Sequence, residues 1–276
     1  MYLRRFWRQI ALGARMDVLL LLGSPAQILL WTVTDVLAYA GGIVAVLLLA
    51  ERFNGIAGWS QPQLVLLVGY STTVSGLQST FFGYNVAAIS RRIGRGQLDH
   101  TLVQPQPLLL AFLTEGFSPF SALGILLPGV VLMGLAVEAG AAAVTATLIG
   151  KLAISLAAST VIVLAGAFAI GAAAFWAPRG AEEISTRAHT LLSLTQFPLD
   201  PVPRAIRTAL VTVIPAGLVA WFPTGALVGR RPEWQWVLTP VVAVVGVAIA
   251  TLIFKKGLRH YARTGSHRYS TFGHRR

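Results

Sequence analysis

The chain has 276 residues, of which 55% are hydrophobic and only 12% are charged. A soluble domain carries about 25% charged residues, so this composition excludes a soluble globular protein and indicates an integral membrane protein. The formal net charge is +12, but Lys and Arg lie between apolar runs and near the chain ends. That distribution is typical of orientation in a bilayer rather than of nucleic-acid binding. The absence of cysteine excludes disulfides, a thiol nucleophile and a cysteine-type metal site.

Residues 1–24 are predicted to form an amphipathic helix that lies along the inner membrane surface and turns inward near Ser24 and Pro25. Tryptophan together with arginine favours the headgroup layer. We expect the segment to be retained, because its charged part is too long for a signal peptide and no cleavage site follows. The arginines and the main apolar residues of this helix are Arg4, Arg5, Arg8, Arg15, Phe6, Trp7, Ile10 and Leu12.

Residues 25–256 are predicted to be an all-α transmembrane domain with six spans, delimited by apolar runs and short polar breaks. The third span holds Pro119 and Pro128, which a membrane helix bundle can absorb. The fourth is rich in Gly and Ala, which allows close helix contact. The approximate spans are 27–50, 62–89, 108–137, 143–176, 184–199 and 236–254.

A polar loop, residues 90–107, separates the second and third spans. It contains three arginines and then a short turn in which Leu98 and Leu102 have i, i+4 spacing, the spacing of one helix face. A charged loop with its own helical turn at the membrane face suits docking to a soluble partner. The alternative is a solvated loop whose arginines only fix the topology.

The region 200–229, just before the last span, is predicted to be a re-entrant pair of helices, 204–214 and 217–227, joined at Pro215. One straight helix cannot pass through so many prolines. Irregular backbone at membrane depth must be buried in protein or face water. The prolines and arginines that define the region are Pro198, Pro201, Pro203, Arg204, Arg207, Pro215 and Pro223.

Six spans place both chain ends on one side of the membrane. Most Lys and Arg residues then fall in the N-terminal helix, the loop 90–107, the connection between the fourth and fifth spans, and a basic tail over 257–276. This imbalance predicts that both termini are cytoplasmic.

Three ionisable residues fall within predicted spans, namely Asp35, Glu115 and Lys151. Charge inside a bilayer is costly unless it is paired or hydrated, so such residues are functional candidates. Asp35 and Lys151 both come near mid-depth, and we hypothesise that they form an ion pair. Glu115 lies nearer the inner face, where it can reach water.

Motifs for several chemistries are absent from the sequence. There is no G-x-x-x-x-G-K-[ST] loop for ATP, no H-E-x-x-H zinc motif and no G-x-S-x-G nucleophile motif. We therefore expect no metal site, no cofactor bound by this chain and no catalysis by the chain itself.

Two stretches carry a resemblance to a known family. IGRGQLDHTLVQP, over 93–105, is similar to the cytoplasmic loop pattern G-x-L-D-x-x-L-V-x-P, and FPLDPVPRAIRTALVTVIPAGLVAWFP, over 197–223, is similar to a proline-rich re-entrant region. With the arginine-rich N-terminal helix, these stretches resemble the ABC type-2 exporter permease family. The branch is that of small six-span bacterial permeases encoded separately from their ATPase.

The resemblance implies a subunit in the bacterial cell (inner) membrane that dimerises, as a homodimer or a heterodimer, and binds two ATP-binding subunits from the cytoplasm. ATP and Mg would be held by those partners. The region 204–227 would lie near the exit gate. The segment 93–103 would be a coupling helix in a groove of the ATPase, with the contact residues Arg92, Ile93, Leu98, Asp99, Leu102 and Val103.

Two alternatives stand beside this interpretation. One is an ion-coupled secondary transporter driven through Asp35, Glu115 and Lys151, although no repeat relates residues 26–137 to 143–256. The other is a structural membrane scaffold with a lipid-binding tail. Only the permease requires an ATPase that binds residues 91–105.

Overall fold

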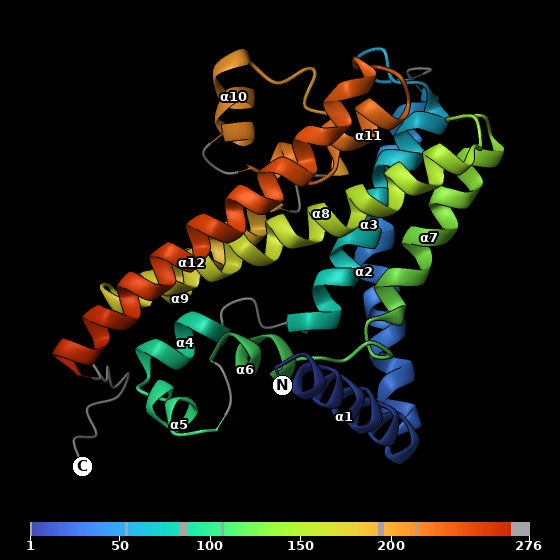
Figure 1. The fold of residues 1–276 in the computed structure, drawn as a ribbon. Helices are drawn as coiled ribbons and strands as arrows, with labels where there is room; N and C mark the ends of the chain where they lie inside the picture. Colours follow the sequence, from blue (N-terminus) through green and yellow to red (C-terminus); the bar gives the residue numbers. More distant parts are fainter. Residues whose placement is uncertain are drawn as a thin grey trace.

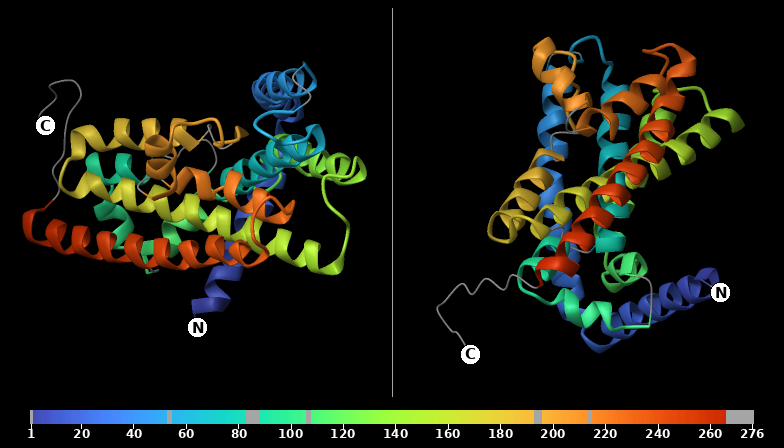
Figure 2. Two further views of the ribbon diagram at one scale, coloured as in Figure 1. Left: turned by 90° about the horizontal axis from the view of Figure 1, so that it is seen from above. Right: turned by 60° about the vertical axis from the view of Figure 1, so that its left-hand side comes forward.

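The structure is a computed structural model, and it describes residues 2–52, 55–82, 88–105, 108–192, 196–212 and 215–265. Every regular element in these ranges is helical, apart from one isolated bridge between Ile56 and Trp59. Helices α2, α3 and α7 stand in one group, and α8, α9 and α12 run side by side in a second, inclined group (Figures 1 and 2). The protein is therefore an all-α membrane protein.

The N-terminal helix α1, Tyr2–Gly23, lies across the end of the molecule, while α2, Pro25–Arg52, rises away from it (Figure 2). Ser24 separates them, and Pro25 begins α2, a position where its missing N–H costs no hydrogen bond. The predicted helix over 1–24 is thus present, and its interfacial position stays a prediction.

Helices α3, Gln61–Phe82, and α7, Leu123–Glu138, make the most extensive helix–helix contact in the described chain. Glycines bring their backbones together. A β-carbon added at Gly129 would lie 2.5 Å from the backbone nitrogen of Thr73, and one at Gly69 would lie 2.8 Å from that of Met133. Without a side chain at these positions, the helices approach as closely as small-residue motifs permit in membranes.

The predicted third span is not one helix. Helix α6, Leu108–Glu115, ends before a turn, and α7 starts only at Leu123. The buried carboxylate of Asp17 in α1 accepts hydrogen bonds from the backbone N–H groups of Phe120 and Ser121, at 2.7 and 3.1 Å. Phe120 and Ser121 lie in the turn just before Ala122, the N-cap of α7, so the carboxylate satisfies backbone donors that the break between the helices leaves without a helical partner.

Helix α8, Ala146–Gly171, begins at an N-cap where Thr145 Oγ1 accepts from the Leu148 N–H at 3.0 Å. It continues as the 3₁₀ turn η1, Ala172–Phe175. The 3₁₀ turn η4, Glu233–Val237, leads into α12, Leu238–Thr264, which packs along α8.

The predicted fifth span, 184–199, is also different. Helix α9 covers Pro178–Leu192, so the expected polar connection over 177–183 is largely helical. The helix carries Glu182, Glu183 and Arg187 and packs on η1 and on α4, Ala88–Gly94. Glu182 forms ion pairs with Arg91 and Arg95 of the preceding loop, and Glu183 pairs with Arg187 within α9.

The proline-rich region forms α10, Arg204–Thr212, then the 3₁₀ turn η3, Pro215–Leu218, and α11, Trp221–Leu227. The chain bends by 72° between α10 and the segment Pro215–Leu227. Such a bend fits either a broken span or a re-entrant loop.

In the described residues, three helices are long and apolar enough to cross a membrane, at Ile28–Val46, Ala146–Phe175 and Glu233–Thr264, and the bent pair would make a fourth. Helix α7 has 16 residues and is about 24 Å long, shorter than the hydrocarbon core of about 30 Å. The six-span arrangement therefore stays a prediction.

Two hydrophobic cores lie toward opposite ends of the molecule, and we name them outer and inner after the predicted orientation of the chain. The outer core joins α3, α7, α8, η3 and α11 around Tyr70 and Trp221. The inner core joins α4, α6, α8, η1, α9 and α12 around Phe175, with Leu98 at its edge. Helix α8 contributes to both cores, Ile162 to the outer one and Phe168 to the inner one.

Candidate functional site

The loop between α3 and α6 contains two short helices, α4 and α5, the latter spanning Leu98–Leu102. Gly96 makes the turn between them with φ of +69°, a conformation that favours glycine. Helices α4, α5 and α6 lie at the same end of the molecule as α1 and the C-terminal end of α12 (Figure 1). This end is the candidate coupling site.

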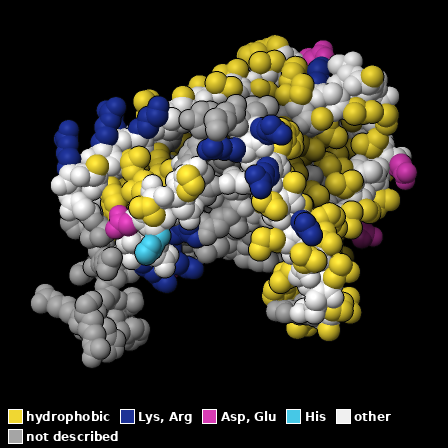
Figure 3. Space-filling model, turned by 60° about the horizontal axis from the view of Figure 1, so that its bottom comes forward, with side chains coloured by type: hydrophobic (Ala, Val, Ile, Leu, Met, Phe, Trp, Pro, Cys, Tyr) yellow, Lys and Arg dark blue, Asp and Glu magenta, His cyan; other side chains and the backbone are white. Residues whose placement is uncertain are grey.

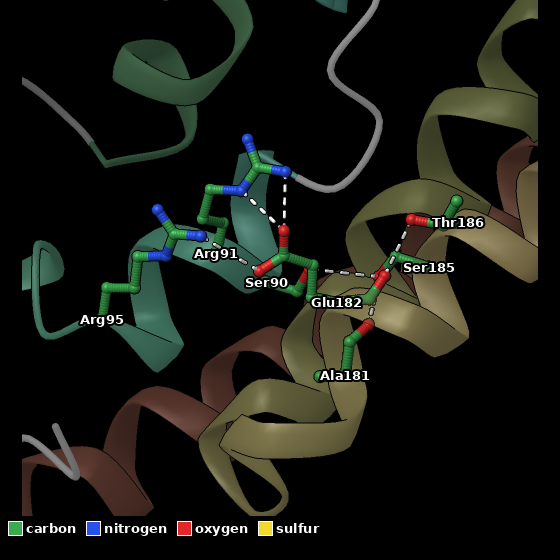
Figure 4. Close-up of polar contacts among 7 residues, drawn as sticks. All are labelled: Ser90, Arg91, Arg95, Ala181, Glu182, Ser185 and Thr186. Carbon is green, nitrogen blue, oxygen red and sulfur yellow. Dashed lines mark hydrogen bonds and ion pairs between the residues drawn. The ribbon is translucent and has the colours of Figure 1, made fainter. Parts of the chain in front are cut away.

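An ion-pair cluster fastens α4 to α9 (Figure 4). Arg91 Nη2 lies 2.6 Å from Glu182 Oε1, and its Nε donates to the same oxygen at 2.8 Å. Arg95 Nη2 lies 3.7 Å from the other oxygen. Beside this cluster, the buried Ser185 hydroxyl donates to Ser90 Oγ at 3.3 Å. The fork of a guanidinium on a half-buried carboxylate fixes the orientation of α4 against α9.

Helix α12 holds α5 from a second side. The buried Tyr261 donates its hydroxyl proton to Asp99 Oδ1 at 2.7 Å. One residue earlier, the His260 ring stacks on Trp176 with centroids 6.0 Å apart. The last turns of α12 therefore connect α5 to the end of α8.

Helix α1 reaches the far end of the same loop. Arg5 Nη1 donates to the Pro105 carbonyl at 3.2 Å, and Thr114 Oγ1 of α6 donates to Gln9 Oε1 at 3.4 Å. The loop 90–105 is thus braced by α9, α12 and α1.

The proposed contact residues fall into two groups. Leu98 has none of its surface exposed and Ile93 is also buried, both in the inner core. Leu102 and Val103 are 43% and 83% exposed. The pair Leu98 and Leu102 therefore does not form one exposed face, because the first turn of α5 packs inward. Leu102 and Val103 form the apolar tip of the loop.

The polar members of the predicted set lie around this tip. Asp99 is exposed and is held by Tyr261. Arg92 is half-buried in α4, and burial lowers the pKa of its guanidinium below the usual value. Lys and Arg side chains are spread over this end of the molecule between hydrophobic areas (Figure 3). The surface combines positive charge with an exposed apolar tip.

A second cluster of polar and aromatic side chains lies at the end of the molecule opposite the candidate coupling site. Trp59, in the connection between α2 and α3, and Trp221 of α11 both donate their indole N–H to Asp200 Oδ2 at 2.7 Å. Arg231 stacks over the Trp221 ring at 4.2 Å. Arg207 of α10 donates to the Asp200 backbone carbonyl at 3.4 Å. Asp200 thus ties the α2–α3 connection to the proline-rich region.

The arginine pair after α11 completes this outer cluster. Arg230 stacks on Trp59 at 4.8 Å and donates to the carbonyls of Ala57 and Gly58. Burial lowers the pKa of Arg231, and the charge of Asp200 partly offsets this effect.

The predicted gate residues differ in exposure. Arg204 is exposed at the start of α10 and Arg207 is half-buried. Among the prolines, Pro198 and Pro223 are buried, Pro215 is half-buried, and Pro201 and Pro203 are exposed. Pro198 lies two residues before Asp200, and Pro223 lies two residues after Trp221.

Replacement of Asp200 by alanine is expected to lower the free energy of unfolding by about 2–3 kcal/mol, because two indole N–H donors of buried rings lose a charged acceptor. Intrinsic tryptophan fluorescence should shift to the red in the same variant, since the indole N–H groups of Trp59 and Trp221 lose their hydrogen-bond acceptor and become accessible to water. Thermal unfolding in detergent would measure the change. Glu138→Ala, an exposed acid, is the control, and equal effects of the two changes would contradict the role of Asp200.

The intramembrane charges are placed differently from the hypothesis. Lys151 lies in the second turn of α8 and pairs with Glu233 of η4, and its ammonium is 5.9 Å from the Trp236 ring centroid. The predicted partner of Lys151, Asp35, is buried in α2. The structure thus gives Lys151, near the N-terminal end of α8, a different ion-pair partner from the one in the hypothesis. The side chain of Glu115 lies outside the described part.

The described residues contain no group of three His, Asp or Glu that could hold a metal ion. Sequence reasoning missed Glu182 and Tyr261, which brace the loop 90–105, Asp200, which joins the opposite cluster, and Asp17, which binds the turn between α6 and α7. A signal existed for Asp17, an isolated acid in an otherwise basic amphipathic helix. Glu182 lies in a stretch that the sequence predicts to be a polar connection.

These features define a class of protein: a helical membrane protein with a braced polar loop at one end and a proline-rich closure at the other. Residues 36–265 match the family described as ABC-2 family transporter protein. The chain belongs to this family, and it is a membrane permease component of the ABC transporter type, which is normally not itself catalytic. No curated protein and no solved structure matches the chain.

Proposed function

We propose that this chain is the transmembrane subunit of an ATP-driven exporter in a bacterial cell membrane, with both termini in the cytoplasm. Two copies of a separate ATP-binding subunit would dock on the loop 90–105 and hold ATP and Mg. A second permease, identical or different, would complete the transport path. The observation that carries the proposal is the exposed apolar tip of Leu102 and Val103 on a loop braced from three sides.

The bracing suits transmission of movement. A displacement of α5 would pull on α12 through Asp99 and Tyr261, and a displacement of α4 would pull on α9 through Glu182. Helix α1 would follow through Arg5. Rigid-body movement of packed helices is the usual form of such a switch.

Val103→Asp is expected to weaken binding of the ATPase by about 30-fold, the effect of losing one central apolar contact of an interface. Val103 is 83% exposed, so the variant should fold normally. The measurement is co-purification with the ATP-binding subunit in detergent, followed by an ATPase assay. Leu98→Asp would be a poor test, since a charge in the inner core would unfold the chain itself.

Val144→Asp is the matched control, because Val144 is equally apolar, 66% exposed and lies in the connection before α8, at the other end of the molecule. If Val103→Asp binds the ATPase as well as Val144→Asp and the wild type do, the loop is not the docking site.

A further inference from the structure

A groove runs along the seam between α8 and α12, on the side where α6 begins. Its cavity volume is about 380 Å³, within the range of about 300–1,000 Å³ that holds small ligands. Small residues form its floor, Ala165 on α8 and Ala250 on α12, both buried. Its walls are apolar and aromatic: Leu164, Phe168, Val247 and Phe254.

The lining of the groove is apolar apart from Thr251 and Lys255, and Leu258 lies about one turn beyond Lys255. Thr251 and Lys255, four residues apart and so on one face of α12, lie toward the end near the coupling site. Neither α8 nor α12 contains an Asp or Glu. This polar part of the groove therefore attracts an anion, with no carboxylate from either helix to compete.

The length of the groove matches one leaflet. From Lys255 to Val247 the helix rises about 12 Å, and half the hydrocarbon core is about 15 Å. Lys255 follows directly after the apolar run of α12, at the depth where headgroups begin.

We propose that this groove binds one anionic phospholipid of the leaflet on the side of α1 and α5, with an acyl chain along the seam and its phosphate at Lys255. The ring of Phe254 contacts Phe112 and Phe175 edge-on, and Phe175 contacts Tyr261 in the same way. The lipid thus lies against the inner core that positions α5, so its occupancy stabilises the coupling site. The site exists without an ATPase partner and does not depend on one.

The test uses the full-length chain in micelles that contain equal amounts of phosphatidylglycerol and phosphatidylcholine with the same acyl chains. Native mass spectrometry then counts the lipids retained on each molecule. The wild type should retain one phosphatidylglycerol in preference to phosphatidylcholine. Lys255→Gln should lower this preference about fivefold, whereas Lys256→Gln, an exposed cation outside the groove, should leave it unchanged.

A second pair of variants tests the apolar part. Val247→Trp should fill the groove and remove the retained lipid, while Val245→Trp, at an equally exposed position of α12 outside the groove, should not. Equal retention of both lipids, or equal loss in the two lysine variants, would show diffuse attraction and overturn the proposal. If Val247→Trp instead dissociates a dimer and leaves lipid retention unchanged, a second copy of the chain covers the groove. That result would also overturn the proposal.

Discussion

Gly129→Ala is expected to lower the free energy of unfolding by about 3 kcal/mol, the upper end of the usual cost of overpacking. The added methyl group would lie 2.5 Å from the backbone nitrogen of Thr73, 2.6 Å from its hydroxyl oxygen and 3.0 Å from the carbonyl of Gly69. Two of these three atoms are backbone and cannot rotate away. The helices α3 and α7 must therefore separate, and the contact along their whole length weakens.

The measurement is thermal or denaturant unfolding of the purified chain in detergent. Gly134→Ala is a matched control five residues later on α7, where an added β-carbon meets no atom within 4 Å. Alanine there should be neutral or stabilise the helix by about 0.5–1 kcal/mol, since glycine costs more backbone entropy. If the two variants unfold alike, close approach of α3 and α7 does not support the fold.

Asp17→Ala is expected to cost about 3 kcal/mol and to loosen the turn between α6 and α7. The Asp17 side chain belongs to a residue only 5% exposed, and it accepts from two backbone N–H groups and from the Ser121 hydroxyl. Removing a charged acceptor leaves these donors unpaired in a buried place, at about 1–3 kcal/mol each before relaxation. Limited proteolysis over 116–122, together with the unfolding temperature, would report the change.

Asp17→Asn should lose about half as much, because the amide keeps one acceptor oxygen but no charge. Arg15→Ala, on the exposed side of the same helix, should change neither readout. A protease pattern identical to the wild type in Asp17→Ala would show that the break between α6 and α7 does not need the carboxylate.

The sequence predicts the class of protein well, and it singles out the two stretches in which the structure gathers many of its polar contacts. A scarcity of charge and long apolar runs indicate a membrane protein, and the amphipathic helix predicted over 1–24 is observed as α1, Tyr2–Gly23. Both unusual stretches, the loop 90–107 and the proline-rich region, mark the two ends where the structure builds its polar clusters.

The errors arise where distant residues decide a local structure. The run 108–137 is apolar enough for one helix, but it breaks because Asp17, about a hundred residues earlier, supplies acceptors to its turn. Leu98 and Leu102 have the spacing of one helix face. Helix α5 has only five residues, however, and its first turn is drawn into a core built from α8 and α12. Local periodicity contains no information about such partners.

Helix α8 contributes side chains to both cores, so a tilt of this one helix moves the two ends of the molecule together. With 26 residues the helix is about 39 Å long, and a tilt of about 5° about its midpoint moves its two ends by about 1.7 Å in opposite directions. Its outer end lies beside the α3–α7 pair and its inner end beside η1 and the loop 90–105. In the proposed transport cycle, a push at the inner end would reach the outer end with reversed sign, and closing one side of the membrane and opening the other would be a single movement.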